Sequence, residues 1–321
     1  MAPTDTAVSE VSGSTADKKP DTDVIELKDD NIGTAVSAAS EVTVWQTLKN
    51  TGKNVVNLAS YLNPLNIFKG KSSSNFDLTS SEYEEERAII KEHGGIYKSV
   101  QGNCGAENNK NGVNFTLCND GCLFIFGKGP MASYFGKVYA PWYAYATQIK
   151  KVVIANGVTS IGDGAFYGCS KLIEVKIPDS VTSIGKSAFE RCSNLTQITI
   201  PSSVKSIGDW AFGNCSNLTQ IIIPDSVTSI GYATFSGCSS LAQITIPSGV
   251  KSIGDYAFHG CSELTEATIP YSVTAIGKGM FSGCRSLTQI TIPSSVKSIG
   301  NWAFYGCSKL IEVKIPDSVT S

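Results

Sequence analysis

Cysteine is the residue whose type and spacing most suggest chemistry here, because thiols can act as nucleophiles, metal ligands or disulfide partners. The chain holds ten cysteines, and seven of them recur at intervals of 23 residues. These seven are Cys169, Cys192, Cys215, Cys238, Cys261, Cys284 and Cys307. We expect neighbours in this column to lie about 5 Å apart with parallel side chains, which favours a structural, buried row of reduced thiols. Disulfides along the column are the alternative, although an odd number of thiols cannot all pair among themselves.

Three further cysteines, Cys104, Cys118 and Cys122, stand outside the column. Cys118 and Cys122 flank a turn signal, so they could form a disulfide in an oxidising compartment. A zinc site that adds His93 is a weaker alternative, because the spacing C-x13-C-x3-C fits no common zinc module. We therefore expect no bound metal.

Catalytic motifs are poorly represented. His93 and His259 are the two histidines of the chain. Gly70-Lys71-Ser72 resembles the end of a phosphate-binding loop, but Leu65 stands where the first glycine of that motif belongs. The patterns G-x-S-x-G, H-E-x-x-H and C-x-x-C do not occur. The sequence predicts neither an enzyme nor a cofactor.

Composition excludes two classes of partner. The 321 residues carry 26 basic and 28 acidic side chains, so the net charge of −2 predicts no general affinity for nucleic acid. No apolar run approaches the roughly 18 residues expected of a membrane-spanning helix. Charged residues make up 17%, below the roughly 25% usual in soluble domains.

The N-terminal region divides into two parts. Residues 1–40 hold eight acidic side chains against three lysines and lack an apolar core, which predicts a disordered acidic tail without a conventional signal peptide. Residues 41–95 form a helical linker region, where apolar residues from Val44 to Leu62 have helical spacing. That helix either docks on the following domain or, less expectedly, lies on a membrane surface. A second helix is expected from the capping pattern Thr79-x-x-Glu82 to Gly94 or Gly95.

Residues 96–154 predict a small β module that serves as a cap. Apolar segments on either side of Asn119-Asp120-Gly121 indicate a β-hairpin. A cluster of aromatic residues comes next, from Tyr134 to Tyr145, directly before a repeat array. Because the first coil of a solenoid needs a cover, we expect this cluster to close its open end.

Residues 155–321 are the repeat array, with seven full copies of 23 residues over 155–315 and a partial eighth. One copy, from Pro201 to Ile223, reads PSSVKSIGDWAFGNCSNLTQIII. A period of roughly 20–29 residues with L-x-x-I-x-I is the leucine-rich repeat pattern. It predicts an α/β-type, mostly β solenoid whose strands pair in one parallel sheet, with a short helical turn that places each Phe at the coil centre. Because the last copy stops at Ser321, we also expect end-to-end self-association, a truncated product or a frayed coil.

The consensus P-x-S-V-x-x-I-G-x-x-A-F-x-x-C-x-x-L-x-x-I-x-I resembles the BspA-like, or Treponema pallidum-type, leucine-rich repeat family over roughly residues 98–321. The resemblance implies a cell-surface or secreted protein, often a surface antigen, that adheres to host proteins such as fibronectin and fibrinogen.

Strand alternation directs Gln220 and Ile222 outward, and the equivalent positions of other coils form a polar sheet face suited to a long polypeptide or a glycan. Its candidate ligand-binding residues are Glu174, Gln197, Thr199, Gln220, Gln243, Thr245, Glu266, Thr268, Gln289, Thr291 and Glu312. Simple solvation of the exterior is the alternative. A second candidate is a set of aromatic anchors in every second coil, Trp210, Tyr256 and Trp302, which either stay exposed or pack on the neighbouring coil.

We accordingly expect a non-catalytic adhesion or protein-binding protein. An intracellular, cytoplasmic scaffold for protein–protein interactions is the alternative, favoured by the missing signal peptide. An ice- or crystal-binding surface is a weaker third possibility, because the threonine columns also contain Gln, Lys and Ile.

Overall fold

The computed structural model describes residues 83–106, 112–134 and 138–321. The tail expected over 1–40, the helix expected between Val44 and Leu62, the segment Gly70-Lys71-Ser72 and the Thr79-x-x-Glu82 capping pattern lie outside these residues.

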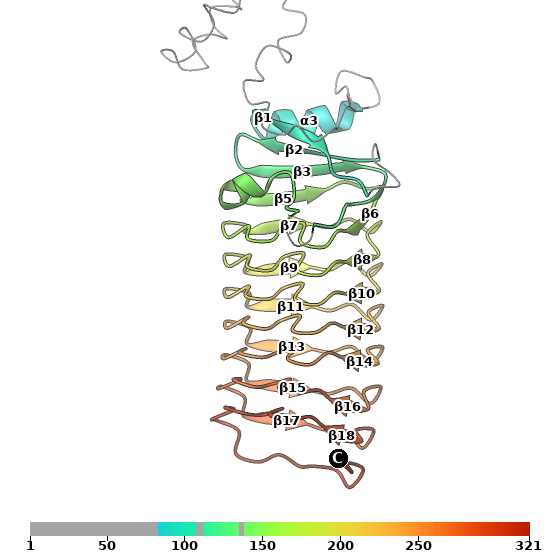
Figure 1. The fold of residues 1–321 in the computed structure, drawn as a ribbon, viewed down its shortest axis with the longest axis vertical. Coiled ribbons are helices and arrows are strands. Elements are labelled where there is room, and N and C mark those ends of the chain that lie inside the picture. The colour runs from blue at the N-terminus through green and yellow to red at the C-terminus, as the bar shows by residue number, and fades with distance from the viewer. Residues whose placement is uncertain (1–82, 107–111, 135–137) are drawn as a thin grey trace, which may run out of the picture. The chain divides into compact units, whose positions relative to one another are not determined.

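The described part opens with a helix and three antiparallel strands (Figure 1). Their bounds are α3 Glu84–Glu92, β1 Ile96–Asn103, β2 Val113–Cys118 and β3 Cys122–Gly127. Gly94 and Gly95, with φ of 77° and 83°, end the helix as expected, since a left-handed backbone suits glycine. The expected hairpin is confirmed, because β2 and β3 pair antiparallel around Asp120 and Gly121.

Both faces of β2 and β3 are buried, which makes this hairpin the link between two hydrophobic clusters. One face packs against Ile90 of α3 through Phe124 and Phe126. The other face contributes Leu123 and Ile125 to the core of the repeat array. The helix therefore covers the face of the hairpin opposite to the one that joins the core of the repeat array.

The cap and the array share one sheet, in the order β1-β2-β3-β5-β7, with β5 at Lys151–Ile154 and β7 at Glu174–Lys176. The pairing changes from antiparallel to parallel between β3 and β5. Just before the 3-10 helix η5, Tyr143–Gln148, Trp142 is buried, stacks on Phe166 at 5.9 Å and donates a 2.9 Å hydrogen bond to the carbonyl of Ala165. Trp142 thus covers the first coil, as expected of the aromatic cluster, whereas Tyr139 and Tyr143 are exposed.

One strand of three residues in each coil forms the first ladder of the array (Figure 1). After β7 these strands are β9 Gln197–Thr199, β11 Gln220–Ile222, β13 Gln243–Thr245, β15 Glu266–Thr268 and β17 Gln289–Thr291. Strands β9 to β17 make one parallel sheet in which partners lie one repeat apart, for example Gln220 and Gln197. The period of 23 residues therefore places equivalent side chains directly above one another.

A second parallel ladder, which the sequence did not predict, runs along the wall containing Val227 and Ile230. Six of its strands make one sheet: β4 Gly129–Pro130, β6 Val158–Ile161, β8 Ser183–Ile184, β10 Ser206–Ile207, β12 Ser229–Ile230 and β14 Ser252–Ile253. The last two, β16 Ala275–Ile276 and β18 Ser298–Ile299, pair in a separate sheet on the same wall. The expectation of one parallel sheet was incomplete, because most of these strands have two residues and so show no alternation that a pattern could reveal.

The turn that comes after the second ladder, residues 208–215 in one coil, forms no helix, although the amides of Ala211, Gly213 and Cys215 donate to carbonyls three residues back, as in the short helical turn that we expected. The alternate amides bond to the next coil: those of Trp210, Phe212 and Asn214 donate to carbonyls 22 residues ahead at 2.8, 2.9 and 2.7 Å. Trp210 and Asn214 adopt φ of 56° and 57°, which turns these amides toward the neighbouring coil. We call this third side of each coil the turn edge.

Phenylalanine fills the coil centres, as the repeat predicted. Neighbouring rings from Phe166 to Phe304 stack at 5.1 to 5.9 Å. All but the last of the series are fully buried. Because each ring contacts the rings above and below, no coil completes its core alone.

Removing one central ring therefore destabilises its own coil and the two coils next to it. We expect Phe212→Ala to lower the free energy of unfolding by about 3–5 kcal/mol, since the ring leaves a cavity between two neighbours that hydrogen bonds hold in place. Chemical denaturation measures the change. Thr245→Ala, at an exposed strand position, serves as the control and should stay within about 0.5 kcal/mol of wild type. A loss below about 1 kcal/mol for Phe212→Ala would contradict the stacked core.

Candidate functional site

The outward positions of the first ladder form a continuous exposed strip, as predicted. Each strand from β7 to β17 has the burial pattern exposed, buried, exposed. Every predicted ligand-binding residue from Glu174 to Thr291 therefore points to solvent, and parallel pairing aligns them, as with Thr268 and Thr291. Glu312 is exposed but lies outside the ladder, since residues 311–316 form no strand. We call the outward residues of β7 to β17 the sheet face.

The sheet face is charged at one end and uncharged over its next three strands. At one end of the sheet face, the Oε1 of Glu174 lies 3.5 Å from the Nζ of Lys151 and 3.7 Å from the Nζ of Lys176. The outward residues of β9, β11 and β13 carry no charge. At their centre Ile222 is 65% exposed and pairs with Thr199 and Thr245 of the adjacent strands. This exposed aliphatic side chain was not among the predicted site residues.

The cysteine column is buried and reduced, as expected. All ten cysteines of the chain fall among the described residues and carry free thiols, so Cys118 and Cys122 are not bridged. From Cys192 to Cys307 each Sγ donates a hydrogen bond of 3.1 to 3.3 Å to a phenylalanine carbonyl of the previous coil. Burial raises the pKa of Cys215 and of Cys261 to about 12. These thiols stabilise the turn and do not form a reactive site.

The predicted aromatic anchors lie on the turn edge in an uncommon conformation. Trp210, Tyr256 and Trp302 have φ of 56°, 59° and 61°, in a region that bulky residues rarely adopt. Trp302 is 62% exposed, and the other two are partly buried. The same column holds glycine at positions 164 and 279. Aromatic side chains here are therefore not needed to make the turn.

Tyr232 and Lys278, which the sequence analysis did not predict as site residues, lie between the aromatic anchors. Tyr232 lies 6.0 Å from Trp210 and 5.8 Å from Tyr256 between ring centroids. The Nζ of Lys278 lies 5.9 Å from the ring of Tyr256 and 5.0 Å from that of Trp302. The five residues make an unbroken line across five coils, which we call the aromatic ridge.

A signal in the sequence could have revealed the ridge. The three coils that carry the anchors begin PSSVKSIGDW, PSGVKSIGDY and PSSVKSIGNW, each with lysine at the fifth position. The coils between them begin PDSVTSIGYA and PYSVTAIGKG. Two kinds of coil thus alternate with a period of 46 residues, twice the basic repeat.

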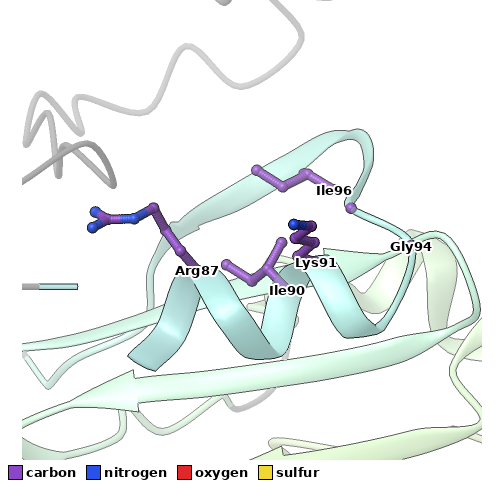
Figure 2. A pocket seen from close by; sticks show the side chains of 6 residues that line it. Arg87, Ile90, Lys91, Gly94 and Ile96 are labelled. Carbon is purple, nitrogen blue, oxygen red and sulfur yellow. The ribbon is translucent and has the colours of Figure 1, made fainter. Parts of the chain in front are cut away.

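A shallow depression of about 560 Å³ lies in the cap, between α3 and the start of β1. Figure 2 shows Ile90 and Ile96 beside the basic side chains of Arg87 and Lys91. Its lining contains no acid, histidine, cysteine or hydroxyl, and its charged side chains are Arg87 and Lys91.

The described residues hold neither a metal-binding cluster nor a membrane-spanning helix. In 83–106, 112–134 and 138–321, no three His, Cys, Asp or Glu side chains gather as a metal site would require. Over the same ranges, no helix has both the length and the apolar character needed to span a bilayer.

Comparison with known families identifies the repeats. The sequence pattern of the BspA type leucine rich repeat region matches residues 137–263 and 229–321, in six copies. Together the matched residues make up more than half of the chain.

Among solved structures, the leucine rich repeat protein of T. pallidum is 32% identical to this chain, with 63% of this chain and 87% of that one covered and a TM-score of 0.49. A leucine rich cell surface protein of Faecalibacterium prausnitzii is 24% identical, covers 65% and 88%, and has a TM-score of 0.25. The pneumococcal vaccine antigen PcpA is 17% identical, covers 68% and 72%, and has a TM-score of 0.41. No curated protein matches.

The thiol environment predicts how the column reacts. In native protein at pH 8 we expect iodoacetamide to leave Cys192, Cys215, Cys238 and Cys261 unmodified, because burial keeps them as inaccessible thiols. Burial raises the pKa of Cys215, so its thiolate is scarce at that pH. Mass spectrometry of native and denatured samples measures the difference.

Cys307 provides an internal comparison, because it is 9% exposed whereas Cys215 is fully buried. It should be the first of the column to react. Rapid modification of Cys215 in the native protein, at a rate similar to that of Cys307, would contradict the structure.

Proposed function

We propose, from the premise that this chain belongs to the BspA type leucine rich repeat family, that it is a non-catalytic adhesion protein whose sheet face binds other proteins. We place it at the cell surface or outside the cell, as the family resemblance implies. Matrix proteins such as fibronectin and fibrinogen are the partners that this resemblance suggests.

The observation that carries the proposal is the uncharged centre of the sheet face. Protein interfaces are depleted of charge at their centre and surrounded by polar groups. Ile222 provides the exposed apolar side chain, and the Gln and Thr side chains around it can donate and accept hydrogen bonds. The charged residues Glu174 and Lys176 lie at one end, where a polar rim is expected.

The dimensions of the sheet face favour an extended partner. Its six strands at about 4.8 Å spacing give a length of about 29 Å, and three residues per strand give a width of about 10 Å. An extended polypeptide of about nine residues would cover this length. A globular partner would need the flanking turns as well to bury the roughly 800 Å² of a standard interface.

A substitution at the centre tests the proposal. Ile222→Lys places a charge where the partner would exclude water, so binding to immobilised fibronectin or fibrinogen should weaken at least about tenfold. Biolayer interferometry with the full chain, at nanomolar to micromolar concentrations, measures the affinity. Circular dichroism should show no change, because the side chain is exposed.

Thr228→Lys is the matched control, since it adds the same charge at an exposed position beside the second ladder. Binding should be retained in this variant. Equal weakening by both substitutions would count against the sheet face. Absence of wild-type binding to matrix proteins and to host cells up to micromolar concentrations would count against adhesion.

A further inference from the structure

We propose that the corner where the β2–β3 turn meets the first coil is a binding site for the acidic side chains of a polypeptide. We call this site the basic corner and define it by Gln148, Lys150 and Lys171, which line a depression there. The choice of a polypeptide as ligand rests on the function proposed for the sheet face. The affinity of the basic corner for carboxylates does not depend on that function.

The depression at the basic corner has a volume of about 230 Å³. Its lining combines parts of the cap and of the array: Tyr97 of β1, Asn119 of the β2–β3 turn, the end of η5, and Lys171 of the first coil. The volume is smaller than the roughly 300–1,000 Å³ of pockets that enclose a drug-sized molecule. It therefore suits one or two side chains of a larger ligand.

Gly121 of the β2–β3 turn allows the depression to form. It has a φ of 88°, and a Cβ there would lie 2.6 Å from the carbonyl oxygen of Gln148 and 3.4 Å from a stem carbon of Lys150. The Lys150 side chain therefore lies across the glycine. The amides of Lys150 and Lys151 donate hydrogen bonds of 2.9 and 3.3 Å to the Gly121 carbonyl, which fixes the backbone that carries this lysine.

Two lysines at the basic corner carry charges that the fold does not use. Lys150 and Lys171 are both exposed. Over the described ranges, no acidic side chain forms an ion pair with either of them. The amide of Ile173 donates a 2.9 Å hydrogen bond to the carbonyl of Lys150, so the segments that carry the two lysines are joined. Two positive charges at one small depression attract an anion.

The acidic side chains next to the basic corner already have partners of their own. The Oδ2 of Asp120 lies 2.6 Å from the Nδ1 of His93. Glu174 lies between two lysines of β5 and β7. Because these carboxylates remain close by, they would repel a polymer with an anion on every unit. The site therefore favours a ligand with one or two carboxylates over a densely sulfated glycan.

The groups at the basic corner match the chemistry of a glutamate side chain. Each lysine ammonium offers three donors, and a carboxylate has about four acceptor positions, so one carboxylate can accept hydrogen bonds from both lysines. The exposed side-chain amide of Gln148 adds an uncharged donor. Ile173, which is 57% exposed and follows Lys171 by two residues, offers an apolar surface to the methylene groups of glutamate.

The basic corner adjoins the end of the sheet face, which indicates how one ligand could use both. Lys150 immediately precedes β5, and in the pairing of β5 with β7 Lys151 lies opposite Glu174, the first residue of the sheet face. The centre of that face is uncharged around Ile222. An extended polypeptide with a neutral segment and an acidic end would therefore be complementary to both surfaces.

Isothermal titration calorimetry of the full chain with hexaglutamate tests the proposal. We expect saturable binding at about 50 mM NaCl that weakens at least about fivefold at about 500 mM, because salt screens exposed charges. Hexaglutamine, which has the same length and no charge, should not bind. Failure of hexaglutamate to bind at millimolar concentration in low salt, or equal binding of hexaglutamine, would overturn the proposal.

Substitutions of the two lysines locate the site. Lys150→Gln and Lys171→Gln remove the charge and keep most of the stem, so circular dichroism should remain that of wild type. Each should weaken hexaglutamate binding about 2- to 5-fold, and the double variant about tenfold. The matched control is the double variant Lys205→Gln and Lys251→Gln, which removes two exposed lysines beside the second ladder. It should change the affinity less than about twofold, and equal weakening by both double variants would overturn the proposal.

Two further measurements separate this inference from the function proposed above. Hexaglutamate should bind Ile222→Lys at least as tightly as wild type, whereas fibronectin should bind that variant more weakly, so failure of one proposal is distinguishable from failure of the other. A heparin hexasaccharide should bind more weakly than hexaglutamate. Tighter binding of the hexasaccharide that is lost when Lys150 and Lys171 are both substituted would overturn the assignment to a polypeptide.

Discussion

Hydrogen bonding between coils, one repeat apart, is the constraint on which the rest of this molecule depends. It acts on three sides of each coil: at the first ladder, at the second ladder and at the turn edge. Because the coils are joined on all three sides, each repeat position becomes a column of equivalent side chains. The interior columns then stack Phe on Phe, and each thiol of the later coils reaches a carbonyl of the coil before it. A surface column, by the same geometry, becomes a stripe of regularly spaced groups.

This constraint explains why substitutions have different consequences inside and outside. A change at Phe212 affects the coils on both sides, since its ring contacts Phe189 and Phe235. Exposed columns are free to vary, and they carry the features that distinguish this chain from a uniform solenoid: the uncharged centre around Ile222 and the alternation of two coil types along the aromatic ridge. The turn edge adds a requirement of its own, because the backbone there must be left-handed to direct its amides at the next coil. In that column Trp210 packs against Tyr232 of the next coil, and Tyr256 packs against Gly279 of the next coil.

Much of the fold could be predicted from the sequence, because a 23-residue period with buried Phe, Cys and Leu allows few arrangements. The hairpin around Asp120, the sheet face and the buried thiols were all predicted from alternation and period. The second ladder was not, since a strand of two residues such as Ser206–Ile207 has no pattern of its own. Strand β1 was missed because it is irregular: its register shifts between Ile96 and Gln101, where Lys98 and Ser99 have positive φ. Tyr232 and Lys278 were missed because they lie one position away from the anchor column and repeat at twice the period.

Amide hydrogen exchange measures most directly whether the coils are joined on all three sides. The amides of Trp210, Phe212 and Asn214 belong to a turn that has neither helix nor strand, yet each donates to the next coil. The account predicts that they exchange as slowly as the hydrogen-bonded amides of β11 in the same coil, because opening either requires the coils to separate. Exchange of the turn-edge amides orders of magnitude faster than that of β11 would contradict it.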